Sequence, residues 1–508
     1  MSAPGTVAVI GGGIAGLATA ALLAEDGHRV EVFEALPATG GRAGSWEHEG
    51  FRFDTGPSWY LMPEVFDRFF GLLGTSAAAE LDLVPLTPAY RVYGEPDADG
   101  PGERIDVVSG RSAATALFES REKGAGARLD AYLDSAADAY DLAVSKFLYD
   151  DYATLAAARD PALLRRLPRL LGMLAEPLSR RVSRTVRDPL LRQILGYPAV
   201  FLGASPFRAP ALYHLMSHLD LDEGVLYPRG GFTEVIAAIE RLAVARGVTV
   251  RTGAEVAEIL TEGGRATGVR LQDGEIVRAD RVVSTADLHH TETALLTPEA
   301  QSHPERVWRR RTPSPGALLV LLGVDGELPA LAHHTLLFTR DWRANFDAIF
   351  GRSPSVPDPA SLYVCRPSAT DDTVAPAGSE NLFVLVPIPA DPSLGRGGVD
   401  GAGAPAVEAA ADRAIAQIAA WTGTPDLAGR IRVRRTIAPA DFAADFHAWR
   451  GNSLGLAHTL AQSGPFRPRP FSRKVSNLSY AGATVLPGIG LPMCLISAEL
   501  VRDRIRES

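Results

Sequence analysis

Three closely spaced glycines near the start of the chain could hold the pyrophosphate of a dinucleotide. Gly11, Gly13 and Gly16 follow the spacing G-x-G-x-x-G. In this arrangement the first glycine permits a tight turn, the second lets the backbone approach a pyrophosphate, and the third lets a helix pack closely on a strand. Glu34 stands about 20 residues further on, where a carboxylate accepts hydrogen bonds from ribose hydroxyls and repels a 2′-phosphate. The pattern therefore predicts a dinucleotide site that disfavours NADP.

These residues need a strand, a helix and a second strand to position them. Residues 7–10 predict the first strand, residues 14–26 a helix that Gly27 ends, and residues 29–33 the second strand. The helix would direct its N-terminal dipole at the phosphates. A secretion signal is not expected because residues 1–6 hold no basic side chain, and the glycines interrupt the stretch too early for a membrane span. A glycine-rich turn without a ligand is the alternative interpretation.

The composition indicates one large domain or two to three ordinary ones. The 508 residues are 46% hydrophobic, which supports a sizeable core, and the net charge of −9 gives no reason to expect nucleic acid as a partner. Cys365 and Cys494 are far apart and are expected to be core thiols in a reducing cytosol. The sequence contains no C-x-x-C or H-E-x-x-H motif, so no metal site is predicted.

Beyond the first two strands, the hydrophobic pattern changes several times. An alanine-rich helical region is expected from about 113 to 219. Short strands are expected after it, at 248–251, 254–261, 266–271, 281–284, 317–324, 362–365 and 381–386, with a helix over 405–421. The chain closes with a strand, a glycine- and proline-rich turn and an amphipathic helix. We expect the first and last segments to build one site.

Several motifs together resemble the bacterial phytoene desaturases and related carotenoid desaturases and oxidases, within the wider flavin amine oxidase-like superfamily. The resemblance runs from about residue 6 to residue 505. Besides the glycine motif, it rests on the segments 40–43 (GGRA), 53–58 (FDTGPS), 227–231 (YPRGG), 282–287 (VVSTAD), 331–335 (LAHHT) and 477–492. The glycine motif is shared by many flavoproteins, whereas the central and C-terminal segments are more specific.

The resemblance implies an FAD cofactor and an α/β fold. The expected architecture is a Rossmann-like FAD-binding domain of the glutathione reductase type with a discontinuous α+β substrate domain. The FAD-binding domain is expected to comprise residues 1–90, 225–300 and 475–508. Residues 91–224 would form a helical region that faces substrate and membrane, and residues 301–474 the remainder of the substrate domain.

The resemblance also carries cofactor contacts over to individual positions. Glu34 would hold the adenosine ribose, Arg42 the pyrophosphate, and the backbone of Val256 the adenine. The full set of expected contacts is Gly11, Gly13, Ile14, Ala15, Gly16, Glu34, Gly41, Arg42, Gly56, Pro57, Val256, Gly482, Gly490 and Pro492. The sequence departs from many relatives in two places. Ala483 and Thr484 stand where an acid is common, and Met493 and Cys494 stand where small residues are common.

The implied reaction is desaturation of phytoene or a similar carotenoid precursor, by hydride transfer from an allylic carbon to the flavin. The substrate would occupy a long apolar tunnel, and oxygen or a membrane quinone would reoxidise the flavin. No proton-accepting residue is assigned: 289–290 and 333–334 are histidine pairs expected to be structural, and Asp54 is as compatible with capping a turn as with catalysis. The alternatives are a related carotenoid oxidase, isomerase or saturase, an amine or porphyrinogen oxidase, and a non-catalytic prenyl-lipid-binding protein like the Rab GDP-dissociation inhibitors.

A basic and apolar segment is the best candidate for a membrane contact. Residues 161–187 contain one acid, Glu176, and seven arginines: Arg165, Arg166, Arg169, Arg180, Arg181, Arg184 and Arg187. With the leucines among them, they predict an interfacial helix on anionic lipid and a cytoplasmic, peripherally membrane-associated enzyme that could form oligomers. The alternative is a domain-surface helix whose leucines pack inward.

Overall fold

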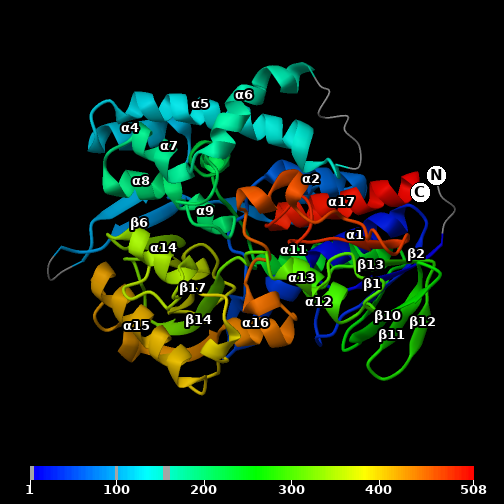
Figure 1. Ribbon diagram of the computed structural model, residues 1–508. Coiled ribbons are helices and arrows are strands. Elements are labelled where there is room, and N and C mark those ends of the chain that lie inside the picture. The colour runs from blue at the N-terminus through cyan, green and yellow to red at the C-terminus, as the bar shows by residue number, and fades with distance from the viewer. Residues whose placement is uncertain (1–4, 98–100, 153–160) are drawn as a thin grey trace.

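The computed structural model describes residues 5–97, 101–152 and 161–508, and of residues 161–165 and 167 the backbone alone. Its first layer is a parallel sheet of five strands in the order β19-β13-β1-β2-β9 (Figure 1). β1 (Thr6–Ile10) lies between β2 (Arg29–Phe33) and β13 (Arg281–Ser284), while β9 (Thr249–Arg251) and β19 (Leu478–Tyr480) form the edges. Strands that are far apart in the sequence thus lie side by side in this sheet. Parallel sheets of this kind bind ligands beyond the carboxyl ends of their strands.

Both faces of this sheet are covered. Val7 and Val9 pack into the core beneath α1 (Ile14–Glu25), α11 (Phe232–Ala245) and α17 (Leu491–Glu507), because alternate residues of a strand point to opposite faces. Ala8 and Ile10 pack toward an antiparallel sheet made of β10 (Val256–Glu262), β11 (Arg265–Leu271) and β12 (Ile276–Arg278). At the far end of α1, the guanidinium groups of Arg502 and Arg506 both bind Asp26 at N–O distances of 2.5 Å, which ties the last helix to the first.

A second, mostly antiparallel sheet of seven strands lies beside the first. Its order is β18 (Ile431–Ile437), β14 (Gly316–Asp325), β17 (Ser379–Ile388), β16 (Leu362–Cys365), β15 (His334–Phe338), β6 (Tyr90–Gly94) and β7 (Arg104–Val107). β14 is buried over nine of its ten residues because both of its faces are covered. Leu318 and Val320 pack under α15 (Pro405–Thr422), and Leu319 and Leu321 face an aromatic core on the opposite side.

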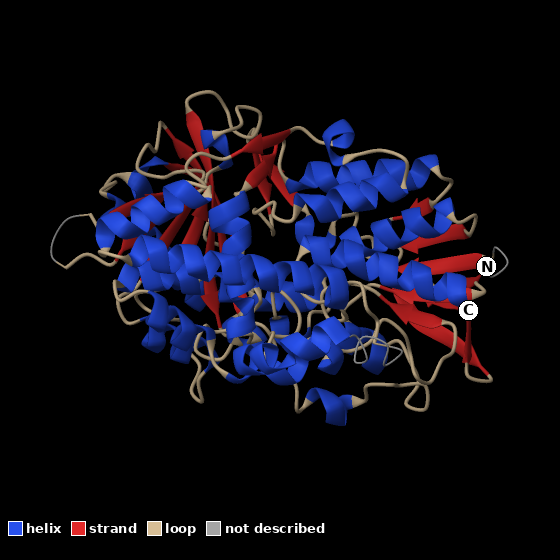
Figure 2. Ribbon diagram, turned by 90° about the horizontal axis from the view of Figure 1, so that it is seen from above, coloured by secondary structure: helices blue, strands red, loops and turns tan. Residues whose placement is uncertain are grey.

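Helices form a layer over these sheets, and Figure 2 shows them across the middle of the molecule with strands on both sides. The predicted helical region contains α4 (Arg111–Arg121), α5 (Ala125–Ala143), α6 (Pro161–Ala175), α7 (Leu178–Thr185), α8 (Pro189–Gly196), α9 (Pro198–Phe201) and α10 (Met216–His218). The remaining α-helices and strands are α2 (Pro63–Leu72), α3 (Ala77–Glu80), α12 (Leu288–Thr293), α13 (Glu305–Trp308), α14 (Trp342–Phe350), α16 (Pro439–Asp445), β3 (Ser45–His48), β4 (Phe51–Asp54), β5 (Leu83–Pro85) and β8 (Leu226–Pro228).

The predicted α/β fold class with a Rossmann-like parallel sheet is confirmed. The expectation of one continuous helix over residues 161–187 is wrong, because α6 ends at Ala175 and α7 begins after Pro177. Pro177 pairs with Pro210 in an isolated bridge, which turns the chain between the two helices. Of the helices in the described part of the chain, none is both long and apolar enough to cross a bilayer.

Candidate functional site

One cavity of about 760 Å³ connects the carboxyl ends of the parallel strands with the space between the helical layer and the seven-stranded sheet. The residues expected at a cofactor meet here although they come from five separate parts of the chain. Those that line the cavity are Gly11, Gly13, Ile14, Ala15, Glu34, Gly41, Arg42, Gly56, Pro57, Val256, Gly482, Gly490 and Pro492. Of the predicted set, Gly16 is the one residue outside this lining.

The three glycines of the first motif have different physical reasons to be glycine. Gly11 has a φ of +99°, which side chains disfavour. A Cβ atom on Gly16 would stand 1.9 Å from the carbonyl oxygen of Gly11, so this position is set by helix–strand contact. A Cβ on Gly13 would find no atom nearer than 3.8 Å. The protein itself therefore leaves the space at Gly13 open for a close-lying ligand.

Two helices begin at the cavity without a side-chain cap. α1 begins after Gly13 and α17 after Gly490, and neither glycine can supply a capping oxygen. The first N–H groups of a helix have no partner within the helix and carry a partial positive charge. The two helix starts therefore offer hydrogen-bond donors to an anionic or carbonyl-bearing ligand in the cavity.

Glu34 and Arg42 provide the opposite charges of this part of the site. The Glu34 carboxylate is buried at the end of β2 and accepts hydrogen bonds from the N–H groups of Gly12 at 2.6 Å and Leu36 at 2.8 Å, which fix its direction. Arg42 is half-buried, but its Nε and Nη2 atoms are themselves buried and have no hydrogen-bond partner among the residues that the structure describes. Burial lowers the pKa of Arg42, and the charge of Asp287 partly opposes this.

An unpaired buried guanidinium is costly, and a diphosphate would satisfy it. The planar fork of arginine matches phosphate oxygens in charge and geometry. Arg42 stands in the short 3₁₀ turn Gly41–Ala43, and Gly41 lies against Gly13 with 3.4 Å between the Gly13 Cα and the site of an added Gly41 Cβ. The open backbone at Gly13, the uncapped start of α1 and Arg42 thus fit the pyrophosphate of a dinucleotide.

The other part of the cavity is apolar and divides into two regions, the first of which we call the aromatic chamber. It is lined by Trp59, Tyr197, Phe201, Phe338, Trp342 and Tyr363. The Trp59 ring stacks on His334 with 4.4 Å between centroids and 10° between planes. The Tyr363 hydroxyl contacts Ser58 Oγ and His334 Nδ1, each at 2.7 Å. These contacts hold the indole of Trp59 in one orientation at the chamber wall.

The second region, the leucine chamber, lies beneath α5 and α6 and is lined by Phe147, Leu148, Leu170, Leu174, Leu212 and Leu215. Leu460 and Phe466 border the same cavity but are 46% and 60% exposed. The Tyr213 hydroxyl donates to Ser463 Oγ at 2.8 Å, so the turn that carries these two residues adjoins the chamber. The leucine chamber therefore approaches the molecular surface at an apolar rim.

Asp54 lies outside the lining of the main cavity. Its carboxylate accepts hydrogen bonds from the N–H groups of Phe232 at 2.8 Å and Thr233 at 3.4 Å, which caps the start of α11. Burial raises the pKa of Asp54 to about 7, against the effect of those two hydrogen bonds. Of the two roles that the sequence allowed for Asp54, the geometry favours capping.

The two histidine pairs occupy different surroundings. His333 and His334 are buried, and their Nδ1 atoms contact Thr370 and Tyr363. With Cys365 they form a group whose donor atoms, one from each residue, lie within 4.8 Å of one another. The sequence spacing does not predict this group, because Cys365 comes opposite His334 only through the pairing of β15 with β16. His289 binds Glu305, and His290 stacks on His447 at 3.9 Å beside the cavity.

Arg467 is a buried residue that sequence reasoning missed. Its guanidinium donates to the carbonyl oxygens of Val485 at 3.0 Å and Ala483 at 2.5 Å, and also to those of Gln462 and Leu456. It thereby holds the C-terminal turn that leads to α17. Thr484, in the position where many relatives carry an acid, lines a small separate pocket together with Arg42 and Asp287.

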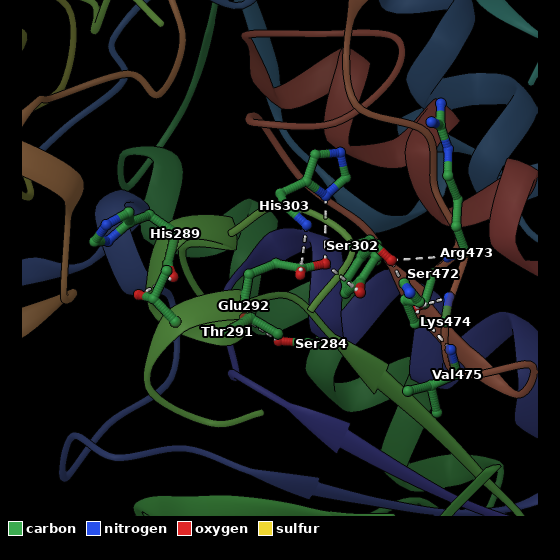
Figure 3. Close-up of polar contacts among 12 residues, drawn as sticks. Ser284, His289, Thr291, Glu292, Ser302, His303, Ser472, Arg473, Lys474 and Val475 are labelled. Atoms are coloured by element: carbon green, nitrogen blue, oxygen red, sulfur yellow. Dashed lines mark hydrogen bonds and ion pairs between the residues drawn. The ribbon is translucent and has the colours of Figure 1, made fainter. Parts of the chain in front are cut away.

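A second buried network supports the same turn from outside the cavity (Figure 3). Glu292 accepts hydrogen bonds from the backbone N–H of His303 at 2.9 Å and from the Tyr480 hydroxyl at 2.6 Å. Burial raises the pKa of Glu292, but the hydrogen bonds outweigh it and the pKa lies below its ordinary value. Ser302 contacts Ser472 at 3.0 Å in the same network. These contacts fix the end of β19 just before Gly482.

Comparison with known proteins covers nearly the whole chain. Residues 14–505 match the family model described as flavin containing amine oxidoreductase. A carotenoid 3,4-desaturase of Haloarcula japonica is 40% identical over 503 residues, 99% of this chain and 98% of the relative. A zeta-carotene-forming phytoene desaturase of Myxococcus xanthus is 37% identical over 98% of this chain and 93% of the relative.

Solved structures share the fold at low identity. An oxidoreductase of Methanosarcina mazei aligns with a TM-score of 0.62 and 18% identity, over 99% of this chain and 100% of that one. Putrescine oxidase bound to putrescine aligns with a TM-score of 0.61 and 16% identity over the full length of both chains. A Rab GDI of Plasmodium falciparum aligns with a TM-score of 0.53 and 11% identity, over 100% of this chain and 99% of that one. At these identities, the alignments concern the fold.

Proposed function

Because the chain belongs to the family of flavin-containing amine oxidoreductases, we propose that it catalyses the FAD-dependent desaturation of phytoene or a similar carotenoid precursor. The observation that carries this proposal is the continuity of one cavity from the dinucleotide cradle at Gly13 and Arg42 into two apolar chambers. Relatives named as carotenoid and phytoene desaturases, similar over nearly their full length, support the substrate class.

We propose that the residues predicted as cofactor contacts hold FAD. Glu34 would accept hydrogen bonds from the adenosine ribose, and Arg42 with the start of α1 would bind the pyrophosphate. The start of α17 at Gly490 would face the flavin, and Gly56 and Pro57 would shape the loop beside its ring. When bound, FAD supplies the acceptor for the hydride that leaves the substrate carbon. Gly16 would act through the contact of α1 with β1.

The chain's own contribution to the reaction is orientation and exclusion of water. A carotenoid precursor is a long hydrocarbon, so its binding energy comes from apolar area removed from water. The aromatic and leucine chambers supply this area on the substrate side of Gly56–Pro57. Trp59 is fixed by His334 and its loop by Ser58, so an allylic carbon would be held against the cofactor in one position.

We propose that the enzyme takes its substrate from the cytoplasmic face of a membrane, through the rim of the leucine chamber. Leu171 on α6 is 55% exposed, and Leu460 and Phe466 stand exposed at the same cavity. Arg166, Arg180 and Arg184 are exposed on α6 and α7. Exposed apolar side chains beside arginines suit the interface of an anionic bilayer. A membrane quinone, or oxygen, would then accept the electrons.

Arg181 does not belong to this proposed membrane surface, although its position in the sequence placed it with the other arginines. Its Nη2 donates to Ser135 Oγ at 2.7 Å, and its guanidinium lies 5.6 Å from the ring centroid of Tyr132. Burial lowers the pKa of Arg181. The side chain of Arg165 lies outside the described part of the molecule.

We also propose the division into an FAD-binding domain of residues 1–90, 225–300 and 475–508 and a substrate domain of residues 91–224 and 301–474. The strands of the parallel sheet all come from the first set. β14 to β18 come from the second set, and β6 begins at its boundary. Each set thus has its own sheet, and the cavity lies where they meet.

Expression in a host that accumulates phytoene tests the function. We expect the purified protein to be yellow and to contain flavin, which absorbance measures. We also expect phytoene to disappear and more conjugated carotenoids to appear, which chromatography measures. The Arg42→Met variant serves as the cofactor-deficient control. Flavin-loaded protein that leaves every supplied carotenoid unchanged would contradict the proposal.

A further inference from the structure

A series of polar contacts leads from the cavity wall into the protein behind the aromatic chamber. Ser58 and Tyr363 both line the cavity. The Tyr363 hydroxyl contacts Ser58 Oγ and His334 Nδ1, each at 2.7 Å. The ring of His334 lies 4.6 Å from the ring of His333 between centroids, and His333 Nδ1 contacts Thr370 Oγ1 at 2.8 Å. These side chains form one series that begins at the cavity.

The outer end of this series reaches the molecular surface. Thr370 is half-buried and directly follows the short 3₁₀ turn Pro367–Ala369, in which Ala369 is exposed. The two histidine rings lie further inside, since His333 is 4% exposed and His334 is fully buried. The series therefore joins the cavity to solvent through two rings that are themselves shielded from bulk water.

The Nε2 atoms of both histidines are buried, and neither has a hydrogen-bond partner within the described ranges of the chain. One nitrogen of each ring and the sulfur of Cys365 lie within 4.8 Å of one another. Two hydrogen bonds of about 2.8 Å that meet at one water molecule span roughly 4.6 Å, so a single water fits between the rings. Burial raises the pKa of the Cys365 thiol to about 12, so the sulfur is not the thiolate that metal ions prefer.

One choice of tautomers satisfies every group in the series. When the Tyr363 hydroxyl donates to His334 Nδ1, the proton of that neutral ring stands on Nε2. The His333 ring then accepts at Nε2 through the water and donates from Nδ1 to Thr370 Oγ1. In this arrangement all the donors point away from the cavity, and the Nε2 atoms of both rings are paired.

Both rings are neutral in the folded protein. Burial lowers the pKa of His333 to about 3, with the charge of Arg366 acting in the same direction and that of Asp371 against it. Burial also lowers the pKa of His334, and His333 adds to the effect. A neutral imidazole has one accepting and one donating nitrogen, so it takes up a proton on one side as it releases one on the other.

The proposed reaction produces a proton in a place without water. Two C–H bonds on neighbouring carbons break. One hydrogen leaves with its electron pair to the flavin, the other leaves as a proton, and the electron pair that it leaves behind forms the new C=C bond. A hydrocarbon that fills the apolar chambers keeps solvent away from this proton, so the protein itself must conduct it outward.

We propose that Ser58, Tyr363, His334, His333 and Thr370 form an exit path for the proton that desaturation removes from the substrate. The proton passes to Ser58 Oγ, each group hands its own proton to the next, and the last group releases one to solvent. The inference rests on the proposed desaturating function and assigns to that function a route for the proton.

Two variants interrupt the exit path. Tyr363→Phe keeps the ring and deletes the hydroxyl in the middle of the path. His333→Ala deletes the second imidazole, near the surface. Tyr227→Phe is the matched control, because its ring packs against His333 with 4.6 Å between centroids while its hydroxyl donates to Asp371, off the path.

The first measurement is flavin reduction in a single anaerobic turnover, on liposomes that contain the carotenoid desaturated by wild type. We expect Tyr363→Phe and His333→Ala to reduce their FAD about a hundredfold more slowly than wild type, as for the loss of a positioned proton-transfer group. Tyr227→Phe should behave like wild type. Free imidazole should restore the rate of His333→Ala, because it replaces the deleted ring. Flavin content and retained carotenoid should be unchanged in all variants.

The second measurement is independent of turnover. Nitrogen chemical shifts of ¹⁵N-histidine-labelled, FAD-loaded protein report which ring nitrogen carries the proton. We expect the proton on Nε2 in His334 and on Nδ1 in His333. The two sets of signals are assigned by their loss in His334→Asn and in His333→Ala.

Wild-type rates in Tyr363→Phe would overturn the exit path and leave the desaturase proposal standing. The same conclusion would follow if imidazole failed to restore flavin-loaded His333→Ala, or if His334 carried its proton on Nδ1. If His333→Ala loses its flavin, Tyr363→Phe and the tautomers decide, since that variant keeps its ring. Wild type that leaves its flavin oxidised with every carotenoid would overturn the desaturase proposal and the exit path together.

Discussion

The part of the cavity that we propose for the cofactor (the cofactor side) and the part that we propose for the substrate (the substrate side) are built on opposite principles. The cofactor side depends on single atoms: the absent Cβ of Gly16, the guanidinium of Arg42, the carboxylate of Glu34. The substrate side depends on the shared area of uncharged aromatic and leucine side chains. A polar cofactor is recognised by positioned donors and acceptors, whereas a hydrocarbon is recognised by volume and dryness. Single substitutions should therefore have discrete effects on the cofactor side and graded effects on the substrate side.

Gly16→Val should have the largest effect of all. A Cβ at this position would stand 1.9 Å from the Gly11 carbonyl oxygen, so α1 must move away from β1. We expect loss of bound flavin and a fall in the free energy of unfolding at or above the upper end of the roughly 1–3 kcal/mol typical of overpacking. Flavin absorbance and urea titration measure the two effects.

Gly71→Ala in α2 is the control, because a Cβ there meets nothing within 4 Å. It should stabilise the protein by up to about 1 kcal/mol through helix propensity. Full flavin content in Gly16→Val would show that the cofactor side tolerates a displacement of α1. Substitutions would then no longer have discrete effects on the cofactor side and graded effects on the substrate side.

Arg42→Met should come second and should act in two directions. Two donors to a diphosphate are lost, at about 1.5–3 kcal/mol for each hydrogen bond to a charged group, so FAD affinity should fall at least a hundredfold. The flavin-free protein should nevertheless melt at a higher temperature than flavin-free wild type, because an unpaired buried cation has been removed. Titration with FAD and calorimetry without it test both statements. A lower melting temperature of flavin-free Arg42→Met would show that Arg42 has a partner inside the protein.

Asp54→Asn should change the pH dependence of stability at the junction of the two sides. The pKa of Asp54 is raised to about 7 in the folded protein, above its ordinary 3.8. The folded state thus holds a proton that the unfolded state has lost, and this contribution to stability is lost as the pH rises from about 4 to about 7. At pH 8, Asp54→Asn should be more stable than wild type by up to about 4 kcal/mol, because the pKa of Asp54 rises from 3.8 to about 7 and each pKa unit corresponds to about 1.4 kcal/mol.

The measurement is urea unfolding at pH 5 and pH 8 for both proteins. The advantage of Asp54→Asn should be smaller at pH 5 than at pH 8. The same advantage at both pH values would mean that Asp54 does not titrate in this range.

The smallest effect should come from the rim of the leucine chamber. Leu460→Ser with Phe466→Ser removes exposed apolar groups from the proposed membrane contact. Liposome binding and turnover of liposome-borne carotenoid should therefore fall about tenfold. This loss is smaller than that expected from two fully buried side chains of this kind, which contribute about 1.5–3 kcal/mol each. Flavin content should stay at the wild-type level.

Replacement of Arg166, Arg180 and Arg184 by Gln should lower liposome binding. High salt should lower the liposome binding of wild type in the same way, because salt screens exposed charges. Flotation of liposomes separates the two variants, and loss of flavin in the serine variant would break the contrast between the sides.

Most residues that we propose for the cofactor side could be selected from the sequence because they lie close together along the chain. Gly11, Gly16 and Glu34 lie on one strand–helix–strand unit, and Arg42 follows directly. The aromatic chamber was not readable, because Trp59, His334 and Tyr363 meet only through the pairing of β15 with β16. The arginines of residues 161–187 were grouped in one membrane-facing set for a related reason, because a count of charges does not show that the Arg181 side chain points inward.

The strand order of the parallel sheet also determines when during translation the sheet can be completed. β1 is made early, but its neighbour β13 follows some 270 residues later, and β19 and α17 follow later still. At about 5–20 residues per second, a ribosome needs roughly half a minute to two minutes for the 508 residues. During that time α1, among the most deeply buried helices of the finished protein, has neither α17 nor Arg502 to cover it. The cavity, which needs residues of both helix starts, is therefore complete only after the segment that carries Gly490 has been made.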